Sequence, residues 1–389
     1  MKSVFDLIII GGGAAGFFAA SQVIQKVPKA KVLILERGKD VLQKVKISGG
    51  GRCNVTNGCW DPTVFCQNYP RGAKELRGPM NRFCSSDLFG WMEDHGVSLN
   101  IEADGRAFPS TNSSQTIIDV LKKASLKKGV LLKTSSSVQS VTKEEHWKIK
   151  TANEQLESRY LLWASGSATP AWKMIQALGL ELINAVPSLF TFEQKAENFS
   201  ALAGQSQAKV IASIPSISRS EEGPILFTHK GFSGPSILRL SAWGARELHD
   251  LNYKFQLQVN FTALKYKDAQ EQIWKSLQEN SNKQVANFPL FGLSKRLYTY
   301  LIGEEYSSKK GHEISRKSLA IISDRLCKAS YEITGKSTFK EEFVTAGGVR
   351  LDQINFKTMA SKVHPTCYFS GEVLDIDAIT GGFNFQAAW

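Results

Sequence analysis

The chain contains 389 residues, of which 42% are hydrophobic, enough for two or three domains that each bury a core. Its charged fraction of 22% and aromatic fraction of 10% exclude disordered and collagen-like proteins. No apolar stretch approaches the ~20 residues that cross a bilayer, and the first residues lack the pattern of a secretory signal. We therefore expect a cytoplasmic protein that has no membrane partner.

The formal net charge is +12, and more than half of this excess falls between residues 254 and 340, where 15 lysines and arginines oppose 8 acidic residues. A basic segment attracts nucleic acids or acidic metabolites. No run of like charges in this segment exceeds two residues, which favours a solvated helical surface instead. No two of the six cysteines are separated by two residues, so we expect reduced thiols and no metal site.

The first 36 residues have the pattern of a strand, a helix and a second strand. Residues 4–10 form an apolar run that is typical of a buried parallel strand. Residues 14–27 have helical character and stop at Pro28, and residues 31–36 form another apolar run. This order predicts a parallel βαβ unit with the usual right-handed crossover.

The rest of the chain divides into an α/β part and an insertion. The α/β pattern continues with expected helices at 83–97, 113–128 and 171–178, and with expected strands within 130–149 and at 160–163.

The insertion begins near residue 189, where strand-like runs are separated by serine, glycine and proline. Two amphipathic helices are expected at 267–278 and 314–328, and the α/β pattern returns at residue 343. The predicted bounds are 1–188 with 342–389 for the discontinuous domain, 189–341 for the insertion, about 189–262 for its β part and about 263–341 for its helical part.

A glycine-rich turn joins the first predicted strand to the helix. Its residues Gly11–Gly16 fit the G-x-G-x-x-G pattern, and Glu36 lies 20 residues further on. In this pattern Gly11 permits a tight turn, Gly13 lets the backbone approach a pyrophosphate, and Gly16 lets the helix pack close to the strand. Because the helix start attracts phosphate and Glu36 can accept a hydrogen bond from a ribose hydroxyl, the turn predicts a dinucleotide site. A turn without a nucleotide is the alternative.

A second glycine-rich loop, Lys46–Asn54, follows the second strand. Its three glycines stand between basic residues, which suits backbone contact with an extended anionic ligand, and a flexible surface loop is the alternative. A simple NAD dehydrogenase needs no such loop, so the loop favours FAD. No further G-x-G-x-x-G with a correctly spaced acid occurs after Asn57. We therefore expect NAD(P)H, if it is the reductant, to bind transiently, and dioxygen is an equally open acceptor.

Five stretches spread along the chain carry a family resemblance. They are GGGAAG at Gly11–Gly16, KISGGGRCNVTN at Lys46–Asn57, FTHKGFSGPSIL at Phe227–Leu238, TAGGV at Thr345–Val349 and GEVLDIDAITGGFNFQAAW at Gly371–Trp389. On these residues the chain resembles the bacterial NAD(P)/FAD-dependent oxidoreductases, also called the aminoacetone oxidase family. The resemblance implies an α/β fold: a Rossmann-like FAD-binding domain of the glutathione-reductase type, made from both chain ends, with an inserted β-barrel and helical domain.

The resemblance also implies which residues hold FAD. Lys46–Asn54 would line the ribityl and flavin region, Gly371 and Glu372 would contact the ribityl-pyrophosphate part, and Gly381–Phe385 would point backbone N–H groups at the flavin pyrimidine edge. A helix start at that edge stabilises the negative charge of a reduced flavin. The expected cofactor-binding residues are Gly11, Gly13, Ala14, Ala15, Gly16, Glu36, Arg37, Lys46, Gly50, Gly51, Arg52, Cys53, Asn54, Val138, Ala164, Ser165, Gly166, Gly371, Glu372, Gly381, Gly382, Asn384 and Phe385.

The chain departs from the family in two places. The small residues Ala164–Gly166 retain a nucleotide-side role, but they are followed directly by the expected helix, where the family often carries further glycines and threonines. The resemblance also implies a terminal helix longer than Gln386–Trp389 provides.

Because flavin chemistry belongs to the cofactor, the candidates for catalysis are polar groups near the flavin. Arg106 either faces a substrate carboxylate or fixes a turn, and His229 either relays a proton or bonds to the backbone. Cys53 is either a redox thiol or an inert buried thiol. Lys46 and Arg52 either hold phosphate and favour the anionic reduced flavin, or only solvate the loop.

The expected function is that of an FAD-dependent oxidoreductase, NAD(P)H-linked or of the oxidase type. Its small-molecule substrate would bind between the FAD domain and the insertion, over the flavin ring. The net charge keeps one alternative open, a flavin-dependent protein that modifies or binds tRNA, although the aromatic and basic pattern of known RNA-binding modules is absent from the sequence. A flavoprotein that senses redox state without turnover is the third possibility.

Overall fold

The computed structural model describes residues 4–127, 129–195, 199–337 and 344–389. The chain folds into two compact units, the first comprising Met1–Val186 and Glu341–Trp389 and the second Pro187–Lys340. The expected boundary after residue 188 lies two residues from this division, and the expected boundary after residue 341 lies outside the described residues. Because the second unit is inserted into the first, both ends of the chain contribute to the unit that carries the glycine-rich turn.

The first unit is built on a sheet whose central strands are parallel. Its strands run in the order β19-β20-β21-β9-β1-β2-β6, and β7 and β8 add an antiparallel hairpin next to β9. All of β2 and the last four residues of β1 are buried, which explains their uninterrupted apolar sequence. The strands are β1 (Phe5–Ile10), β2 (Val32–Leu35), β6 (Val130–Lys133), β7 (Val138–Lys143), β8 (Trp147–Thr151), β9 (Gln155–Trp163), β19 (Ile354–Asn355), β20 (Ala360–Ser361) and β21 (Cys367–Phe369).

The register of the three central strands brings their carboxyl ends together. Ile10, the last residue of β1, is paired with Leu35 of β2 on one side and with Trp163 of β9 on the other. The residues that follow these strands therefore leave the sheet at the same edge, which is where open α/β sheets bind ligands.

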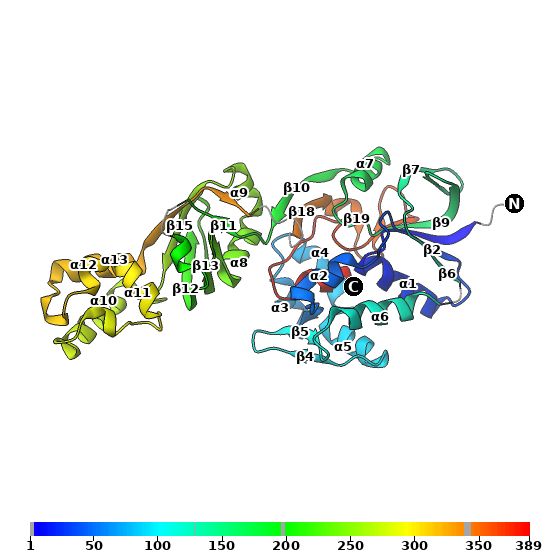
Figure 1. Cartoon of the computed structure of the whole chain (residues 1–389). Helices are drawn as coiled ribbons and strands as arrows, with labels where there is room; N and C mark the ends of the chain where they lie inside the picture. The colour runs from blue at the N-terminus through cyan, green and yellow to red at the C-terminus, as the bar shows by residue number, and fades with distance from the viewer. Residues whose placement is uncertain (1–3, 128, 196–198, 338–343) are drawn as a thin grey trace. The chain divides into compact units, whose positions relative to one another are not determined.

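Helices cover the sheet of the first unit. α1 (Ala14–Lys26) connects β1 to β2, and α6 (Ser114–Ser125) packs beside it (Figure 1). The helices expected at 83–97, 113–128 and 171–178 are confirmed as α5, α6 and α7, with ends shifted by up to three residues. The other elements of this unit are α2 (Gln43–Gly51), α3 (Pro62–Cys66), α4 (Ala73–Met80), α5 (Ser85–Asp94), α7 (Thr169–Ala177), α14 (Phe383–Ala388), β3 (Thr56–Asn57), β4 (Leu99–Ile101), β5 (Arg106–Pro109), β10 (Leu182–Ser188) and β18 (Val344–Val349).

The second unit contains a seven-stranded antiparallel sheet in the order β16-β15-β12-β13-β14-β11-β17. The two strands at its ends are separated in the chain only by Thr334, so the sheet curls toward a barrel. Phe192, Phe227 and Phe232 are fully buried in this unit and contribute to its aromatic core. The elements are β11 (Phe192–Glu193), β12 (Ser206–Ile214), β13 (Arg219–Phe227), β14 (Gly231–Ser233), α8 (Pro235–Trp243), α9 (Ala245–Asp250), β15 (Phe255–Asn260), α10 (Tyr266–Glu279), α11 (Lys295–Ile302), α12 (Glu304–Ser307), α13 (Arg316–Cys327), β16 (Ala329–Ile333) and β17 (Gly335–Lys336).

The expected division of the insertion, a β part to residue 262 and a helical part from 263 to 341, is wrong in one respect. Helices α10 to α13 lie between Tyr266 and Cys327, but the chain returns to the sheet at 329–336. Only Ile333 of β16 is buried, and this five-residue alternation directly after a helix is too short a signal to recognise.

Within the described ranges, no helix is both long and apolar enough to span a membrane. The described residues also hold no group of three or more histidine, cysteine, aspartate or glutamate side chains that would bind a metal ion.

Candidate functional site

The G-x-G-x-x-G turn has the close backbone contacts that its glycines predict. Gly11 has a φ of 119°, and a Cβ atom on it would lie 2.2 Å from the carbonyl oxygen of Ala164. A Cβ atom on Gly16 would lie 2.1 Å from the carbonyl oxygen of Gly11. Larger residues at these two positions would therefore separate α1 from the ends of β1 and β9.

Gly13 differs from these two glycines because a Cβ atom there would meet no protein atom within 4 Å. Gly13 is also the N-cap of α1, without a side-chain cap, and the first N–H groups of a helix, here those of Ala14, Ala15 and Gly16, have no partner within it. Open space beside uncapped N–H groups and a helix dipole suits a phosphate group.

Glu36 lies at the end of β2 and shapes the same turn. Its Oε2 accepts a hydrogen bond from the N–H of Gly12 at 2.8 Å, and its Oε1 accepts one from the N–H of Gly38 at 2.7 Å. A carboxylate has about four lone-pair sites, so the half-buried Glu36 retains capacity for ribose hydroxyls. The neighbouring Arg37 is exposed, and Val138 is half-buried at the start of β7.

The second glycine-rich loop combines left-handed backbone with open space. Gly49, Gly50 and Gly51 have φ values of 57°, 66° and 84°, and they interrupt the helical geometry of α2. Cβ atoms on Gly50 and Gly51 would meet nothing within 4 Å, so their backbone is accessible to a ligand. Lys46 is exposed at the start of this loop, and the Oδ1 atom of Asn54 at its end is buried without a partner among the described residues.

Cys53 does not have the properties of a redox thiol. It is fully buried, and burial raises the pKa of its thiol to about 12, an effect that a hydrogen bond with Ser48 only partly offsets. The thiol therefore stays protonated near neutral pH, whereas a nucleophilic or redox-active cysteine reacts as the thiolate. The structure thus favours the inert interpretation of Cys53.

Arg52 and Arg106 lie together around one carboxylate. Arg52 donates to Oε1 of Glu102 at 2.5 Å, and Arg106 donates to Oε2 of Glu102 at 2.8 Å and to Asp104 at 2.7 Å. The Arg52 guanidinium also stacks on the ring of Phe108, 3.9 Å from its centre. Because its charge is already matched across the turn between β4 and β5, Arg106 fits the turn-fixing interpretation better than a free substrate anchor.

The segment Ala164–Gly166 follows β9 at the same edge of the sheet. Ala164 is buried, and the Oγ atom of Ser165 is a second buried side-chain oxygen with no partner in the described part of the chain. Gly166 has a φ of 59°, and its carbonyl accepts a hydrogen bond from the indole of Trp172 at 3.0 Å.

Near the end of the chain, Gly371 and Glu372 lie against the first glycine-rich turn and α2. A Cβ atom on Gly371 would lie 3.0 Å from the Cβ of Ala15, and Glu372 accepts a hydrogen bond from the N–H of Thr345 at 3.0 Å. Glu372 also forms an ion pair with Lys44, which the sequence did not single out.

The last expected segment, Gly381–Phe385, turns into α14. A Cβ atom on Gly382 would lie 2.1 Å from the carbonyl oxygen of Thr56, so only glycine fits there. The side chain of Asn384 accepts from the N–H of Ala378 at 2.9 Å and donates to the carbonyl of Ala378 at 3.0 Å. Asn384 therefore fixes the preceding loop, while Phe385 stacks on Trp389.

Three residues that sequence reasoning missed hold this segment in place. Asn57 donates to the carbonyl of Gly381 at 3.0 Å, and the fully buried Tyr69 donates to the carbonyl of Phe383 at 2.6 Å. Burial raises the pKa of Tyr69 well above its usual value, so its hydroxyl remains a donor. Asp377, fully buried before the turn, pairs with Arg71 through both carboxylate oxygens. Asn57 and Asp377 belonged to the recognised second and last stretches without being singled out there, but no sequence signal marked Tyr69.

These residues fit a dinucleotide such as FAD. Two glycine-rich segments place open glycine backbone at Gly13 and Gly50, and an uncapped helix start lies beside Gly13. Asn54 and Ser165 each supply a buried oxygen whose partner is not another described residue. A buried polar atom without a partner is costly, and a bound ligand would satisfy it.

His229 belongs to the second unit, in the turn between β13 and β14, where it is exposed. No hydrogen bond to its ring is found among the described residues, so the structure gives no support for the expected backbone-bonded histidine. Its role as a proton relay stays a prediction.

Comparison with known proteins agrees with this geometry. The family model of the HI0933-like protein Rossmann domain matches residues 5–389. The chain is 29% identical to the ribosomal RNA dihydrouridine synthase of Escherichia coli (strain K12), over 99% of this chain and 95% of that protein. It is 25% identical to the 3-dehydro-bile acid delta(4,6)-reductase of Clostridium scindens, over 98% of this chain and 95% of that protein.

Among solved structures, the open conformation of a flavocytochrome c3 fumarate reductase aligns with all of this chain and 76% of its own, at a TM-score of 0.47 and 14% identity. The family match confirms the α/β fold with a Rossmann-like domain and supports FAD as the cofactor. The chain therefore belongs to the HI0933-like Rossmann-domain family.

Proposed function

We propose that this protein is an FAD-dependent reductase that saturates a carbon–carbon double bond conjugated to a carbonyl group. One observation carries the proposal. Two relatives that span nearly the whole chain have names that describe this same reaction on unrelated molecules. Dihydrouridine is uridine with two hydrogen atoms added across a double bond next to a carbonyl, and a delta(4,6)-reductase removes such double bonds from a 3-oxo steroid.

FAD would supply hydride transfer and the storage of two electrons when bound. The chain would hold it with the residues described above. The turn around Gly13 would bind the pyrophosphate, Glu36 the adenosine ribose, and the Gly49–Gly51 backbone would approach the flavin region. Asn57 and Tyr69 would fix the Gly381–Phe385 segment through its carbonyls, so that its backbone N–H groups are held in one orientation.

We propose NAD(P)H as the electron donor. Each double bond takes up one hydride and one proton, so the substrate, NAD(P)H and a proton give the dihydro product and NAD(P)⁺. No second dinucleotide fingerprint follows Asn57 in the sequence, which agrees with a nicotinamide that binds transiently and leaves.

Uridine in RNA is the substrate that the observations favour most. The two dihydrouridine synthases, of Escherichia coli and Haemophilus influenzae, are 29% and 28% identical to this chain and cover it almost completely. The net charge of +12 agrees with a polyanionic substrate. A small unsaturated ketone is the second candidate, favoured by the bile acid reductase at 25% identity. The small-molecule substrate expected from the sequence, over the flavin ring, stays a prediction.

The test begins with the visible spectrum of purified protein reconstituted with FAD, which we expect to be yellow. Under anaerobic conditions NADH or NADPH should bleach this absorbance. Addition of a ribosomal RNA transcript should then restore it and yield dihydrouridine, detected as nucleosides that are heavier by two hydrogen atoms. A cyclic enone and a steroid dienone replace RNA in parallel reactions.

The outcomes separate the possibilities. Reoxidation by a small enone and not by RNA would move the assignment to the second candidate. A flavin that is reoxidised by dioxygen but by no unsaturated acceptor would indicate an oxidase. A flavin that NAD(P)H reduces but that neither dioxygen nor any of the unsaturated acceptors reoxidises would indicate a redox sensor. A protein that binds no FAD would refute the proposal altogether.

A further inference from the structure

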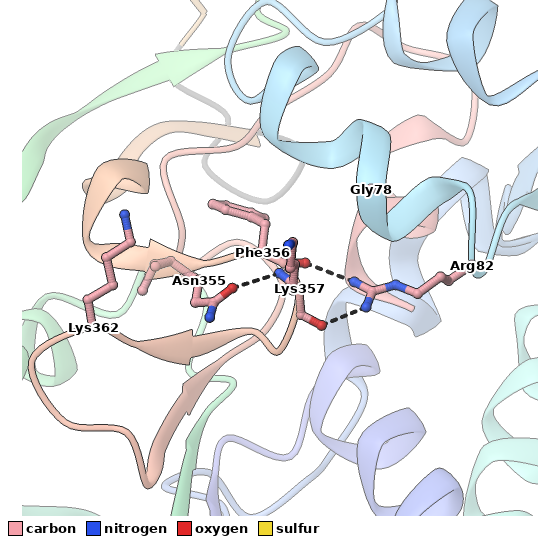
Figure 2. A pocket seen from close by; sticks show the side chains of 7 residues that line it. Gly78, Arg82, Asn355, Phe356, Lys357 and Lys362 are labelled. Carbon is pink, nitrogen blue, oxygen red and sulfur yellow. Dashed lines mark hydrogen bonds between the residues drawn. The ribbon is translucent and has the colours of Figure 1, made fainter.

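A basic pocket lies in the first unit, and none of the residues that line it is among those that fit FAD. It has a volume of about 500 Å³ and is open to solvent. One wall comes from the end of α4 and the other from the hairpin of β19 and β20, as Figure 2 shows. The residues that line it are Gly78, Arg82, Ile354, Asn355, Phe356, Lys357 and Lys362.

The two walls are held together by Arg82. Its guanidinium donates to the carbonyl of Lys357 at 2.6 Å and to the carbonyl of Phe356 at 2.8 Å (Figure 2). Asn355 accepts from the N–H of Lys357 at 3.0 Å within the hairpin turn, and Lys362 donates to the carbonyl of Asp352 at 2.6 Å. The pocket is therefore preformed, because Arg82 links its two walls, which are about 275 residues apart in the chain.

The pocket is positively charged and no acidic residue lines it. Arg82, Lys357 and Lys362 contribute three cations, and all three side chains are exposed. The acidic residue closest in the chain, Asp352, has its carboxylate paired with Arg350 at 2.6 Å. Arg82 uses two of its five N–H groups on the hairpin and Lys362 one of its three, so donors remain for an anion. Like charges gathered in this way attract an anionic partner.

We propose that this pocket binds the phosphate backbone of the RNA substrate, an assignment that rests on the RNA form of the proposed function. An open pocket of about 500 Å³ is far larger than one phosphate group needs, and its cations are spread over both walls. The half-buried ring of Phe356 adds an aromatic surface beside the cations, a combination that single-stranded nucleic acid uses for stacking and charge contact.

Helix α4 connects the pocket to Gly381–Phe385, the segment that is expected beside the flavin. Arg71, just before α4, pairs with Asp377, and Arg82, just after it, holds the hairpin. The carbonyl of Phe83 also accepts a hydrogen bond from Gln386 in α14 at 3.3 Å. RNA held in the pocket would therefore be anchored at a fixed position relative to the C-terminal part of the site, and would gain affinity without direct reading of bases.

The test compares the full-length variant K357Q/K362Q with the control K29Q/K127Q. The control removes the same charge from two exposed lysines of the same unit that do not line the pocket. The probe is a fluorescein-labelled single-stranded 20-nucleotide oligouridylate, followed by anisotropy between 50 and 300 mM KCl. The logarithm of the binding constant falls linearly with the logarithm of the salt concentration, and each phosphate contact that is lost makes this slope shallower by about 0.7 for single strands. Because K357Q/K362Q removes two such contacts, we expect its slope to be shallower by about 1.4. This corresponds to binding that is about 25-fold weaker at 0.1 M salt.

Equal losses in both double variants, or no loss in either, would overturn the proposal. Flavin content and bleaching by NADH are measured on every variant and should match the wild type. If the wild type binds no flavin but the pocket variant still loses RNA affinity selectively, the reductase assignment fails while the pocket assignment stands. If the pocket variant instead keeps its RNA affinity and loses only the bleaching of its flavin by NADPH, the pocket binds a phosphate of the nicotinamide nucleotide. The RNA assignment is then refuted.

Discussion

A comparison of Gly13→Ala with Gly16→Ala separates cofactor binding from folding at the nucleotide turn. At Gly16 the new Cβ atom would lie 2.1 Å from a backbone oxygen, so α1 has to move by more than an ångström. Such overpacking costs about 1–3 kcal/mol, and contact with rigid backbone places it near the upper end. Alanine favours the helix by about 1 kcal/mol relative to glycine, which offsets part of this loss in the free energy of unfolding. We expect a net loss of about 2 kcal/mol, or about 4–8 °C in Tm for a unit of this size.

At Gly13 the same methyl group meets no protein atom, and the extended backbone, with a φ of −91°, accepts alanine. Alanine is a poorer N-cap than glycine, which lowers the free energy of unfolding, but it also restricts the unfolded chain, which raises it. These two effects cancel to within about 0.5 kcal/mol. The methyl group does enter the space assigned to the pyrophosphate, so FAD binding should weaken by about 1–3 kcal/mol, or roughly 5- to 150-fold.

Circular dichroism melting of the FAD-free proteins and fluorescence titration with FAD provide the two measurements. The reasoning is refuted if Gly13→Ala lowers the Tm of the FAD-free protein as much as Gly16→Ala does. It is also refuted if Gly13→Ala binds FAD as tightly as the wild type, because the pyrophosphate then does not lie beside this residue.

Three further predictions concern buried groups. Asn54→Ala removes an unpartnered oxygen, so the FAD-free protein should keep its Tm or gain in Tm while FAD binds roughly 5- to 10-fold more weakly; a lower Tm would show that the amide has a protein partner. Arg71→Ala removes the cation that pairs with the buried Asp377 carboxylate, and urea unfolding should show a loss of about 3–5 kcal/mol, whereas a loss below 1 kcal/mol would contradict the burial of this pair. Burial raises the pKa of Cys53 and Cys367 to about 12, so both thiols stay neutral in the folded protein but ionise near pH 9 in the unfolded chain. The free energy of unfolding should thus keep its full value below pH 9 and fall between pH 9 and 12 by up to about 4 kcal/mol per thiol. Urea unfolding of a Cys53→Ala, Cys367→Ala double variant should show a smaller decrease over this pH range. An equal decrease in both proteins would contradict the burial of these thiols.

The nucleotide turn could be predicted from the sequence because its determinants are local. Gly11, Gly13 and Gly16 each serve the backbone geometry that their spacing indicates, and Glu36 follows at the distance set by one helix and one strand. Periodicity likewise revealed the buried strands β1 and β2 and all five described helices of ten or more residues, since long regular patterns record which face is buried.

The supports of the site could not be predicted because they depend on contacts across hundreds of residues. Tyr69 lies outside the recognised stretches, and Asp377 is not distinguished from its neighbours within the last one. Only the fold shows that Tyr69 contacts Phe383 and that Asp377 pairs with Arg71. Glu102 was missed for the same reason, although it joins two arginines that the sequence had singled out separately.

The hydrogen bonds from Asn57 to Gly381 and from Tyr69 to Phe383 join residues more than 300 positions apart in the chain. During synthesis on a ribosome, Asn57 and Tyr69 therefore emerge more than 300 residues before their partners in the cofactor site. The inserted unit, Pro187–Lys340, is translated before Gly381 and Phe383 and has time to fold before they emerge. Acquisition of the cofactor would thus report that Gly381 and Phe383 have been translated, and chains that terminate before them should be colourless.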